Sequence, residues 1–218
     1  MQYQDTAHFN MLEQELRPNE VSNQRVLAAF NDVNRGDFVD ESLLGLAYAG
    51  MTLPIGHGQV MLPPLLQGKM LQTLDIQADE DVLEIGTGTG YFTVLLAQLA
   101  RSVISVELYA ELTKTAEQNL ANDDINNVTL LTGDASRGWP LDDRLDVIVL
   151  TAAFIDIPDT FLHNLKVGGR LLCFVGEAPV VYMQLIHRTG ERAWHTETVL
   201  ETVVPPMVNA EPETEFEF

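Results

Sequence analysis

The fold is decided by one stretch of sequence, Asp81-Val82-Leu83-Glu84-Ile85-Gly86-Thr87-Gly88-Thr89-Gly90. Its first half is short and largely apolar, and predicts a strand buried on both faces. Glycines then occupy every second position, and Tyr91 to Leu99 predicts a helix. Glycine permits positive φ and close approach of a ligand to the main chain. The free amides at the helix start face the same space. This strand–turn–helix unit therefore predicts a ligand site at the carboxyl end of a parallel strand.

The rhythm of strand and helix continues beyond this unit. The stretches that predict further parallel strands are Val103–Glu107, Val128–Leu131, Leu145–Leu150 and Arg170–Val175. Helices are expected between these strands, one of them from about Ala110 to Leu120. Val180–His187 and Thr196–Val204 then predict two strands with no helix between them, which indicates an antiparallel edge. The predicted fold is α/β: an open, doubly wound, mostly parallel seven-stranded sheet with helices on both faces.

The region before the sheet has a different texture. Val26, Leu27 and Phe30 recur at helical spacing, and a helix is expected after Pro63-Pro64. Met51–Gln59 contains a proline and two glycines, so no regular element is expected there. We predict an N-terminal helical and loop segment over residues 1–75 that packs on the catalytic domain. A Rossmann-like ligand-binding domain would span residues 76–206, and residues 207–218 would form an acidic, flexible tail.

Composition narrows the class of partner. Against 12 Lys and Arg there are 32 Asp and Glu, giving a formal net charge of -20, which disfavours a nucleic-acid partner. No apolar run reaches the roughly 18 to 20 residues that span a bilayer, so no membrane partner is expected. The single cysteine, Cys173, has no companion ligands, and no metal site is predicted. The first residues lack the pattern of a signal peptide, so the expected location is cytoplasmic.

The residues after the first strands discriminate between two classes of cofactor. The dinucleotide fingerprint G-x-G-x-x-G/A needs a small third residue, and that position is Tyr91 here. Glu107 ends the second strand, where a carboxylate can accept both ribose hydroxyls of either cofactor. Asp134 follows the third strand and is placed to accept from an adenine amino group, beside the Ala135 amide; the alternative role of Asp134 is a helix N-cap. The set favours adenosylmethionine over a nicotinamide dinucleotide.

Several motifs together resemble one family. They are Val82–Tyr91 preceded by Leu53–Gln59, then Val149–Ala153 with Ile157-Pro158, Leu165–Leu171 and, near the N-terminus, Arg35–Val39. In this combination, from about Leu12 to about Pro206, the chain resembles the protein-L-isoaspartate O-methyltransferases. The resemblance implies a class I methyltransferase fold. It also implies transfer of a methyl group from S-adenosyl-L-methionine to the carboxylate of an L-isoaspartyl residue in a protein or peptide, a protein-repair activity.

The expected site follows from the glycine turn, the neighbouring strand ends and the resemblance. The residues expected to hold the cofactor are Glu84, Gly86, Thr87, Gly88, Gly90, Glu107, Leu108, Gly133, Asp134 and Ala135. His57 and Thr151 are the candidate catalytic residues. His57 has the alternative role of holding its glycine-rich loop by hydrogen bonds, and Thr151 that of capping a turn.

The chain departs from the family pattern at one place. Val60-Met61-Leu62 stands where the family usually carries Thr-Ile-Ser, and Leu62 occupies the position of the serine that the resemblance marks as catalytic. Leucine offers no hydrogen-bond donor. The substitution therefore predicts weak isoaspartyl activity that Val60→Thr with Leu62→Ser would raise. It leaves open two alternatives: a methyltransferase of the same fold with another, small acceptor, and a cofactor-binding protein with little catalysis.

Overall fold

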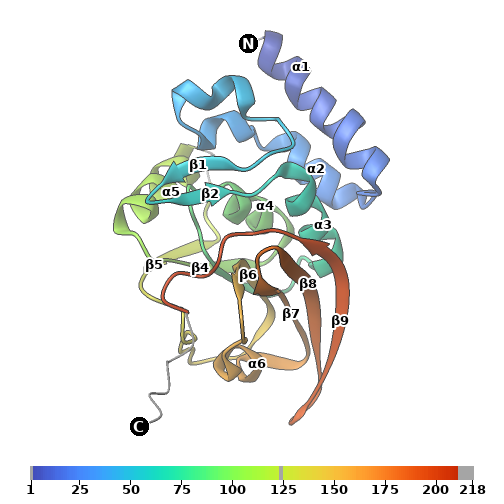
Figure 1. Cartoon of the computed structure of the whole chain (residues 1–218), viewed down its shortest axis with the longest axis vertical. Helices are drawn as coiled ribbons and strands as arrows, with labels where there is room; N and C mark the ends of the chain where they lie inside the picture. The colour runs from blue at the N-terminus through green and yellow to red at the C-terminus, as the bar shows by residue number, and fades with distance from the viewer. Residues whose placement is uncertain (1, 123–124, 211–218) are drawn as a thin grey trace.

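The computed structural model describes residues 2–122 and 125–210 and is built around one large sheet (Figure 1). Its order is β5-β4-β3-β6-β7-β8-β9. The first five strands of this order run parallel to one another, whereas β8 pairs antiparallel with both β7 and β9. The strands are β3 Asp81–Ile85, β4 Ser102–Glu107, β5 Val128–Thr132, β6 Leu145–Phe154, β7 Leu165–Glu177, β8 Val180–Gly190 and β9 Ala193–Thr202. The predicted mostly parallel α/β sheet of seven strands with an antiparallel C-terminal edge is confirmed.

Strand β3, which leads into the glycine turn, lies inside the sheet between β4 and β6. From β3 the chain steps outward to β4 and β5 and then returns to place β6 on the other side of β3. Ile85 pairs with Val106 of β4 and Leu150 of β6, so three carboxyl ends meet at one point. Open parallel sheets bind ligands where the strand order reverses in this way. The topology thus sets the glycine turn at the switch point.

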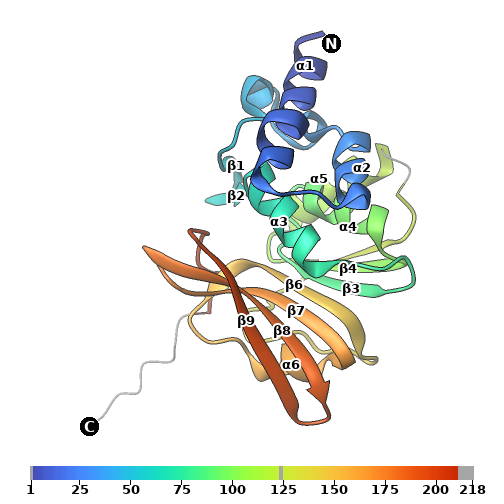
Figure 2. The ribbon, with the colours of Figure 1, turned by 90° about the vertical axis from the view of Figure 1, so that its right-hand side faces the viewer.

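Helices cover the two faces of the sheet unequally (Figure 2). One side carries α1 to α5; their bounds are α1 Gln2–Asn10, α2 Gln24–Asp32, α3 Pro64–Leu74, α4 Tyr91–Leu99 and α5 Ala110–Asn122. The opposite side carries the short α6, Asp159–His163. The expected helix between the third and fourth strands of the parallel set is absent, since residues 133–144 form turns. On this side of the sheet, Trp139 of the turn segment and Phe161 of α6 pack with the buried apolar residues of the strands.

The N-terminal segment packs on this sheet. One buried cluster contains Leu16 and Phe30 together with Leu71 of α3 and Leu95 of α4. Between the helices lie the short π-helix η1 Met11–Leu16 and the 3₁₀ turns η2 Arg17–Asn19, η3 Arg35–Phe38 and η4 Glu41–Leu46. The helix expected after the two prolines is confirmed as α3, which has Pro64 in its first turn.

The prediction that Met51–Gln59 forms no regular element is wrong. Strand β1, Leu53–Gly56, pairs antiparallel with β2, Gln59–Met61, as a hairpin that lies over the carboxyl ends of the sheet (Figure 1). The turn residues His57 and Gly58 both have positive φ. Residues that adopt positive φ make tight hairpin turns, so the glycines that suggested a break are what joins the two strands.

The C-terminal segment also differs from prediction. Residues 207–210 do not form a free tail, because the Met207 amide donates to the Ala153 carbonyl at 2.7 Å and the Ala153 amide to Pro205 at 2.8 Å. The Asn209 side chain donates to Asp134. The remaining residues of the expected tail, 211–218, lie outside the described residues. Among the described residues, no helix combines the length and apolar character that crossing a membrane requires.

Candidate active site

Two adjoining cavities lie at the carboxyl ends of the parallel strands. The strand-end cavity is bounded by Glu107, Leu108, Gly133 and Ala135 and is closed by Met207 of the C-terminal segment. The helix-side cavity reaches toward α3 and α4, where it is bounded by Gln67, Tyr91 and Phe92. Six residues line both cavities: Ile55, Val60, Leu62, Gly86, Gly88 and Thr151. The two spaces therefore meet between the glycine turn and the β1–β2 hairpin.

The glycine turn leaves no room for side chains. A Cβ on Gly86, where φ is +100°, would overlap the Thr151 hydroxyl, and a Cβ on Gly88 would lie 2.8 Å from Ile55 Cδ1. Thr151 lies within β6 and donates its hydroxyl to the Ile85 carbonyl at 2.9 Å, so it does not cap a turn. Gly90 lines neither cavity; a Cβ there would meet Leu120 of α5 at 2.7 Å. Gly86 and Gly88 thus shape the cavity, whereas Gly90 permits helix packing.

Glu107 lies at the floor of the strand-end cavity, as the sequence predicts. Its two carboxylate oxygens accept the backbone amides of Gly88 at 2.8 Å and Tyr109 at 3.0 Å, and the residue is 5% exposed. An ionised carboxylate has about four acceptor positions. Each oxygen therefore keeps capacity for a ligand hydroxyl while the backbone fixes its position. Ribose binding by Glu107 stays a prediction that this geometry allows.

Glu84 does not reach the cavities. Its side chain is fully buried, and one oxygen accepts hydroxyl hydrogen bonds from Thr93 and Ser105, each at 2.6 Å. Ser105 also bonds the Thr87 hydroxyl at 2.6 Å. Burial raises the pKa of Glu84 to about 7. The interpretation of Glu84 as a direct cofactor contact is wrong for its side chain, which instead supports the glycine turn from below through Thr87, a wall residue of the helix-side cavity.

The loop after β5 brings backbone, not a carboxylate, to the cavity wall. Gly133 and Ala135 line the strand-end cavity, while Asp134 between them is exposed and is not among the lining residues. Asp134 accepts the Ser136 amide and the Asn209 side chain, both at 2.8 Å. No helix follows it, so the alternative N-cap role does not apply. In the structure Asp134 anchors residue 209 beside the cavity, and its adenine contact remains a prediction.

His57 lies at the tip of the hairpin, outside both cavity walls. Its ring stacks on Tyr109 with centroids 4.4 Å apart, and its Nε2 lies 3.7 Å from a Glu111 carboxylate oxygen. Tyr109 itself lines the strand-end cavity. These contacts favour the alternative role of His57, namely holding the hairpin against the loop after β4. The His57 ring makes its contact by stacking, and the hydrogen bond within the loop is the one that Gln59 donates to the His57 backbone carbonyl at 3.3 Å.

Two residues of the site, Arg35 and Gln67, were not predicted from the sequence, and they lie at the α3 side of the helix-side cavity. Arg35 is fully buried, and its guanidinium donates to the carbonyls of Ala47 at 2.8 Å and Leu62 at 2.6 Å and to Gln67 Oε1 at 2.5 Å. It also lies 4.7 Å from the centre of the Tyr91 ring. Gln67 was hidden within an apolar helical stripe. Its polar side chain on the buried face of α3 is the sequence signal that could have revealed it.

Comparison with known proteins decides the family. The family model described as protein-L-isoaspartate(D-aspartate) O-methyltransferase matches residues 7–212. The chain belongs to this family. A protein-L-isoaspartate O-methyltransferase of Myxococcus xanthus is 45% identical over 156 residues, 72% of this chain and 74% of the relative. One from Aliivibrio salmonicida is 36% identical over 205 residues, 94% of this chain and 98% of the relative.

Solved structures support the same fold. A beta-aspartate methyltransferase of Plasmodium falciparum, in complex with S-adenosyl-L-homocysteine, superposes with a TM-score of 0.81 at 18% identity over 92% of this chain and 97% of that one. As a member of this family, the chain is an S-adenosyl-L-methionine-dependent methyltransferase. The residues present fit such a cofactor, because Gly86 and Gly88 open a space that Cβ atoms would fill and Glu107 presents a fixed acceptor beside it.

Proposed function

We propose that this chain methylates the side-chain-derived carboxylate of L-isoaspartyl residues in proteins or peptides, as a step in protein repair. The observation that carries the proposal is the pair of adjoining cavities. The strand-end cavity carries the glycine turn and Glu107 expected for the cofactor, and it opens past Gly86 and Thr151 into the helix-side cavity. An acceptor in the second cavity would face the cofactor across six shared wall residues.

The chemistry asks for positioning and not for a base. When bound, adenosylmethionine supplies an electrophilic methyl group: a carboxylate lone pair forms the new C–O bond while the S–methyl bond breaks and its electrons remain on sulfur. A carboxylate is already ionised at neutral pH, since its reference pKa is about 4. The roof residues Ile55, Val60 and Leu62 are apolar and exclude water from this junction. That His57 lies outside the cavity walls is consistent with a reaction that needs no general base.

The proposal is tested by methyl transfer from labelled adenosylmethionine to a synthetic isoaspartyl peptide. The control is the same peptide with a normal aspartyl linkage. We expect turnover of the isoaspartyl peptide alone, followed by release of label as the ester collapses to the succinimide. Calorimetry should show binding of S-adenosylhomocysteine and none of nicotinamide dinucleotides. Cofactor binding without any methylation of the isoaspartyl peptide would refute the substrate assignment.

A second candidate function is favoured by Leu62. It lines both cavities with an apolar side chain where the resemblance places a serine, so a smaller or less polar acceptor is an alternative substrate. Methylation of small carboxylic acids or hydroxyl compounds by a chain that ignores isoaspartyl peptides would support this alternative. The double variant Val60→Thr with Leu62→Ser, which restores two hydroxyls, should then gain isoaspartyl activity.

A further inference from the structure

We infer that Gln67 of α3 is the residue that binds the acceptor carboxylate in this chain, in place of the hydroxyl that is missing at Leu62. This inference rests on the proposed function and names a substrate-binding residue for it. Gln67 is 3% exposed, and it lines the helix-side cavity together with Leu62 and Thr151. The residue is thus polar, buried and placed at the wall that the acceptor must face.

The orientation of the Gln67 side chain is fixed by its neighbour. An arginine can only donate hydrogen bonds, so the Gln67 atom that receives Arg35 Nη1 at 2.5 Å must be the amide oxygen. The amide nitrogen consequently occupies the other position of the carboxamide. None of the described residues forms a hydrogen bond with this nitrogen. The inaccessible side-chain atoms without a partner are Glu84 Oε1 and Tyr91 Oη, so the Gln67 nitrogen is not shut off from the solvent. Two N–H donors therefore remain for a ligand in the cavity.

Arg35 adds a second, independent reason for an anionic ligand. Its buried guanidinium is bonded to three neutral oxygens, two of them on the cavity residues Leu62 and Gln67. Within the described chain no carboxylate lies at ion-pair distance from it. The Glu15 carboxylate interacts with Arg35 electrostatically but does not pair with it directly. A buried charge without a directly bonded counter-ion is costly, and a further anion nearby lowers that cost. A carboxylate held by Gln67 would lie one side chain away from this positive charge.

The Gln67 amide also compensates for the hydroxyl that the chain lacks at Leu62. Leu62 removes a hydroxyl but leaves its carbonyl bonded to Arg35, and the same guanidinium holds the Gln67 amide. The hydrogen bond lost at one wall of the helix-side cavity is therefore available from another wall. On this basis we expect native isoaspartyl turnover, whereas the sequence alone predicted weak activity.

The test compares two substitutions that remove the amide donors. Gln67→Glu keeps an acceptor for Arg35 and so preserves the fold, but it replaces the NH₂ group with a negatively charged oxygen. Gln67→Leu removes the donors without adding charge. The matched control is Gln98→Leu, the same change at an exposed position of α4. Thermal unfolding and calorimetry with S-adenosylhomocysteine report on folding and on the cofactor site.

In both variants we expect the KM for the isoaspartyl peptide to rise at least about tenfold, with the affinity for S-adenosylhomocysteine unchanged within about twofold. Binding to the native chain, saturated with S-adenosylhomocysteine, should favour the isoaspartyl peptide over its amide analogue, isoasparaginyl peptide. Gln67→Glu should abolish or reverse that preference, which a purely structural glutamine would not affect.

Two results would overturn the inference. A native chain that binds and methylates the isoaspartyl peptide, beside a Gln67→Glu variant with unchanged KM and unchanged peptide preference, would overturn the role of Gln67 alone. A native chain that neither binds nor methylates the isoaspartyl peptide would overturn the proposed function and this inference with it.

Discussion

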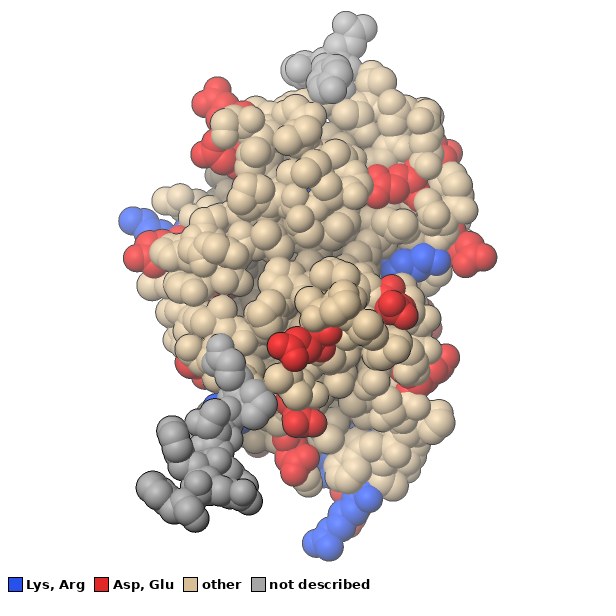
Figure 3. Space-filling view, in the orientation of Figure 1, with Lys and Arg blue, Asp and Glu red and all other residues tan. Residues whose placement is uncertain are grey.

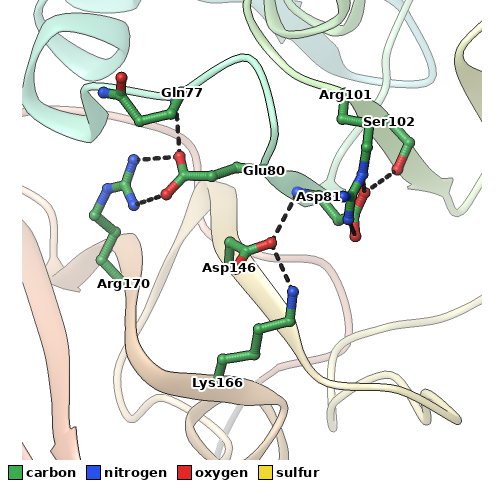
Figure 4. A network of polar contacts seen from close by, with 8 residues as sticks. All are labelled: Gln77, Glu80, Asp81, Arg101, Ser102, Asp146, Lys166 and Arg170. Atoms are coloured by element: carbon green, nitrogen blue, oxygen red, sulfur yellow. Dashed lines mark hydrogen bonds and ion pairs between the residues drawn. The ribbon is translucent and has the colours of Figure 1, made fainter.

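The amino ends and the carboxyl ends of the parallel strands differ in how their polar and charged side chains are partnered. At the amino ends, charged side chains are paired with one another (Figure 4). Arg170 binds Glu80 through two hydrogen bonds of 2.7 and 2.8 Å, and Lys166 binds Asp146 at 2.8 Å. Burial alone raises the pKa of Glu80. The hydrogen bonds from Arg170 and from the Gln77 backbone amide, together with the charge of Arg170, outweigh burial and lower the pKa below its usual value.

At the carboxyl ends, polar groups are left with free capacity. One oxygen of Glu84 is buried without a partner, Gln67 keeps its amide donors, and the charge of Arg35 is met by neutral oxygens. Burial, not pairing, dominates the pKa of Glu84. The difference shows where stability and function reside: the charged groups at one end of the sheet are paired within the protein, whereas the other end keeps unpaired polar groups, of which Gln67 lines a cavity.

Surface charge does not make this distinction. On the face shown in Figure 3, acidic side chains are spread across the surface and are not gathered at one place. The large negative net charge of -20 therefore says little about the site. The partnering of buried groups, which requires the tertiary structure, is what separates the two ends.

The largest effect is expected from closing the glycine turn. Gly86→Ala sets a Cβ against the Thr151 hydroxyl at a φ of +100°, which an alanine adopts only with strain. We expect affinity for S-adenosylhomocysteine to fall at least about a hundredfold in calorimetry. The control is Gly45→Ala, where a Cβ meets nothing within 4 Å. Equal affinity in the Gly86 variant would place the cofactor elsewhere.

A smaller effect should distinguish the two ends by pH. The pKa of Glu84 is raised to about 7 in the folded chain, so its ionisation destabilises the fold as the pH rises from about 4.5 to above 7. Gln at this position does not titrate. We expect the free energy of unfolding of Glu84→Gln, relative to the native chain, to increase by about 2–3 kcal/mol between pH 5 and pH 8.

The matched variant at the amino end should behave in the opposite sense. The pKa of Glu80 is lowered, so its contribution is present above the unfolded pKa of about 4.5 and is lost as the pH falls through the folded value. Glu80→Gln should cost about 1–3 kcal/mol at pH 7, a deficit that shrinks in acid. Denaturant unfolding across pH measures both variants, and parallel pH profiles would contradict the proposed contrast.

The smallest effect concerns the cofactor contact at Glu107. Glu107→Ala removes the acceptor fixed by the Gly88 and Tyr109 amides. Hydrogen bonds to charged groups contribute on the order of 1.5–3 kcal/mol, so adenosylmethionine affinity should fall at least about tenfold. Glu117→Ala, an exposed residue of α5, serves as control. An unaltered affinity would show that Glu107 only organises the loop.

Much of the fold was accessible from the sequence because its signals are local. The bounds of β3 and α4 agree with prediction, since a buried apolar run and a helix start are both read within a few residues. Tyr91, too bulky for a dinucleotide fingerprint, packs edge-on against Phe30 and Phe38 of the N-terminal segment. The family motifs, the cofactor class and the central position of the glycine turn were likewise determined by the sequence.

The tertiary structure alone decided which polar residues meet. Arg35 and Gln67 lie 32 residues apart, and nothing local predicts that their side chains bond beneath the site. The same holds for Glu84, whose side chain does not reach the cavities, and for Met207 and Val208, which line the strand-end cavity. The hairpin at His57 was missed because glycines mark breaks and tight turns alike. Side-chain direction and long-range contact depend on packing between distant segments, and a local sequence pattern does not contain that information.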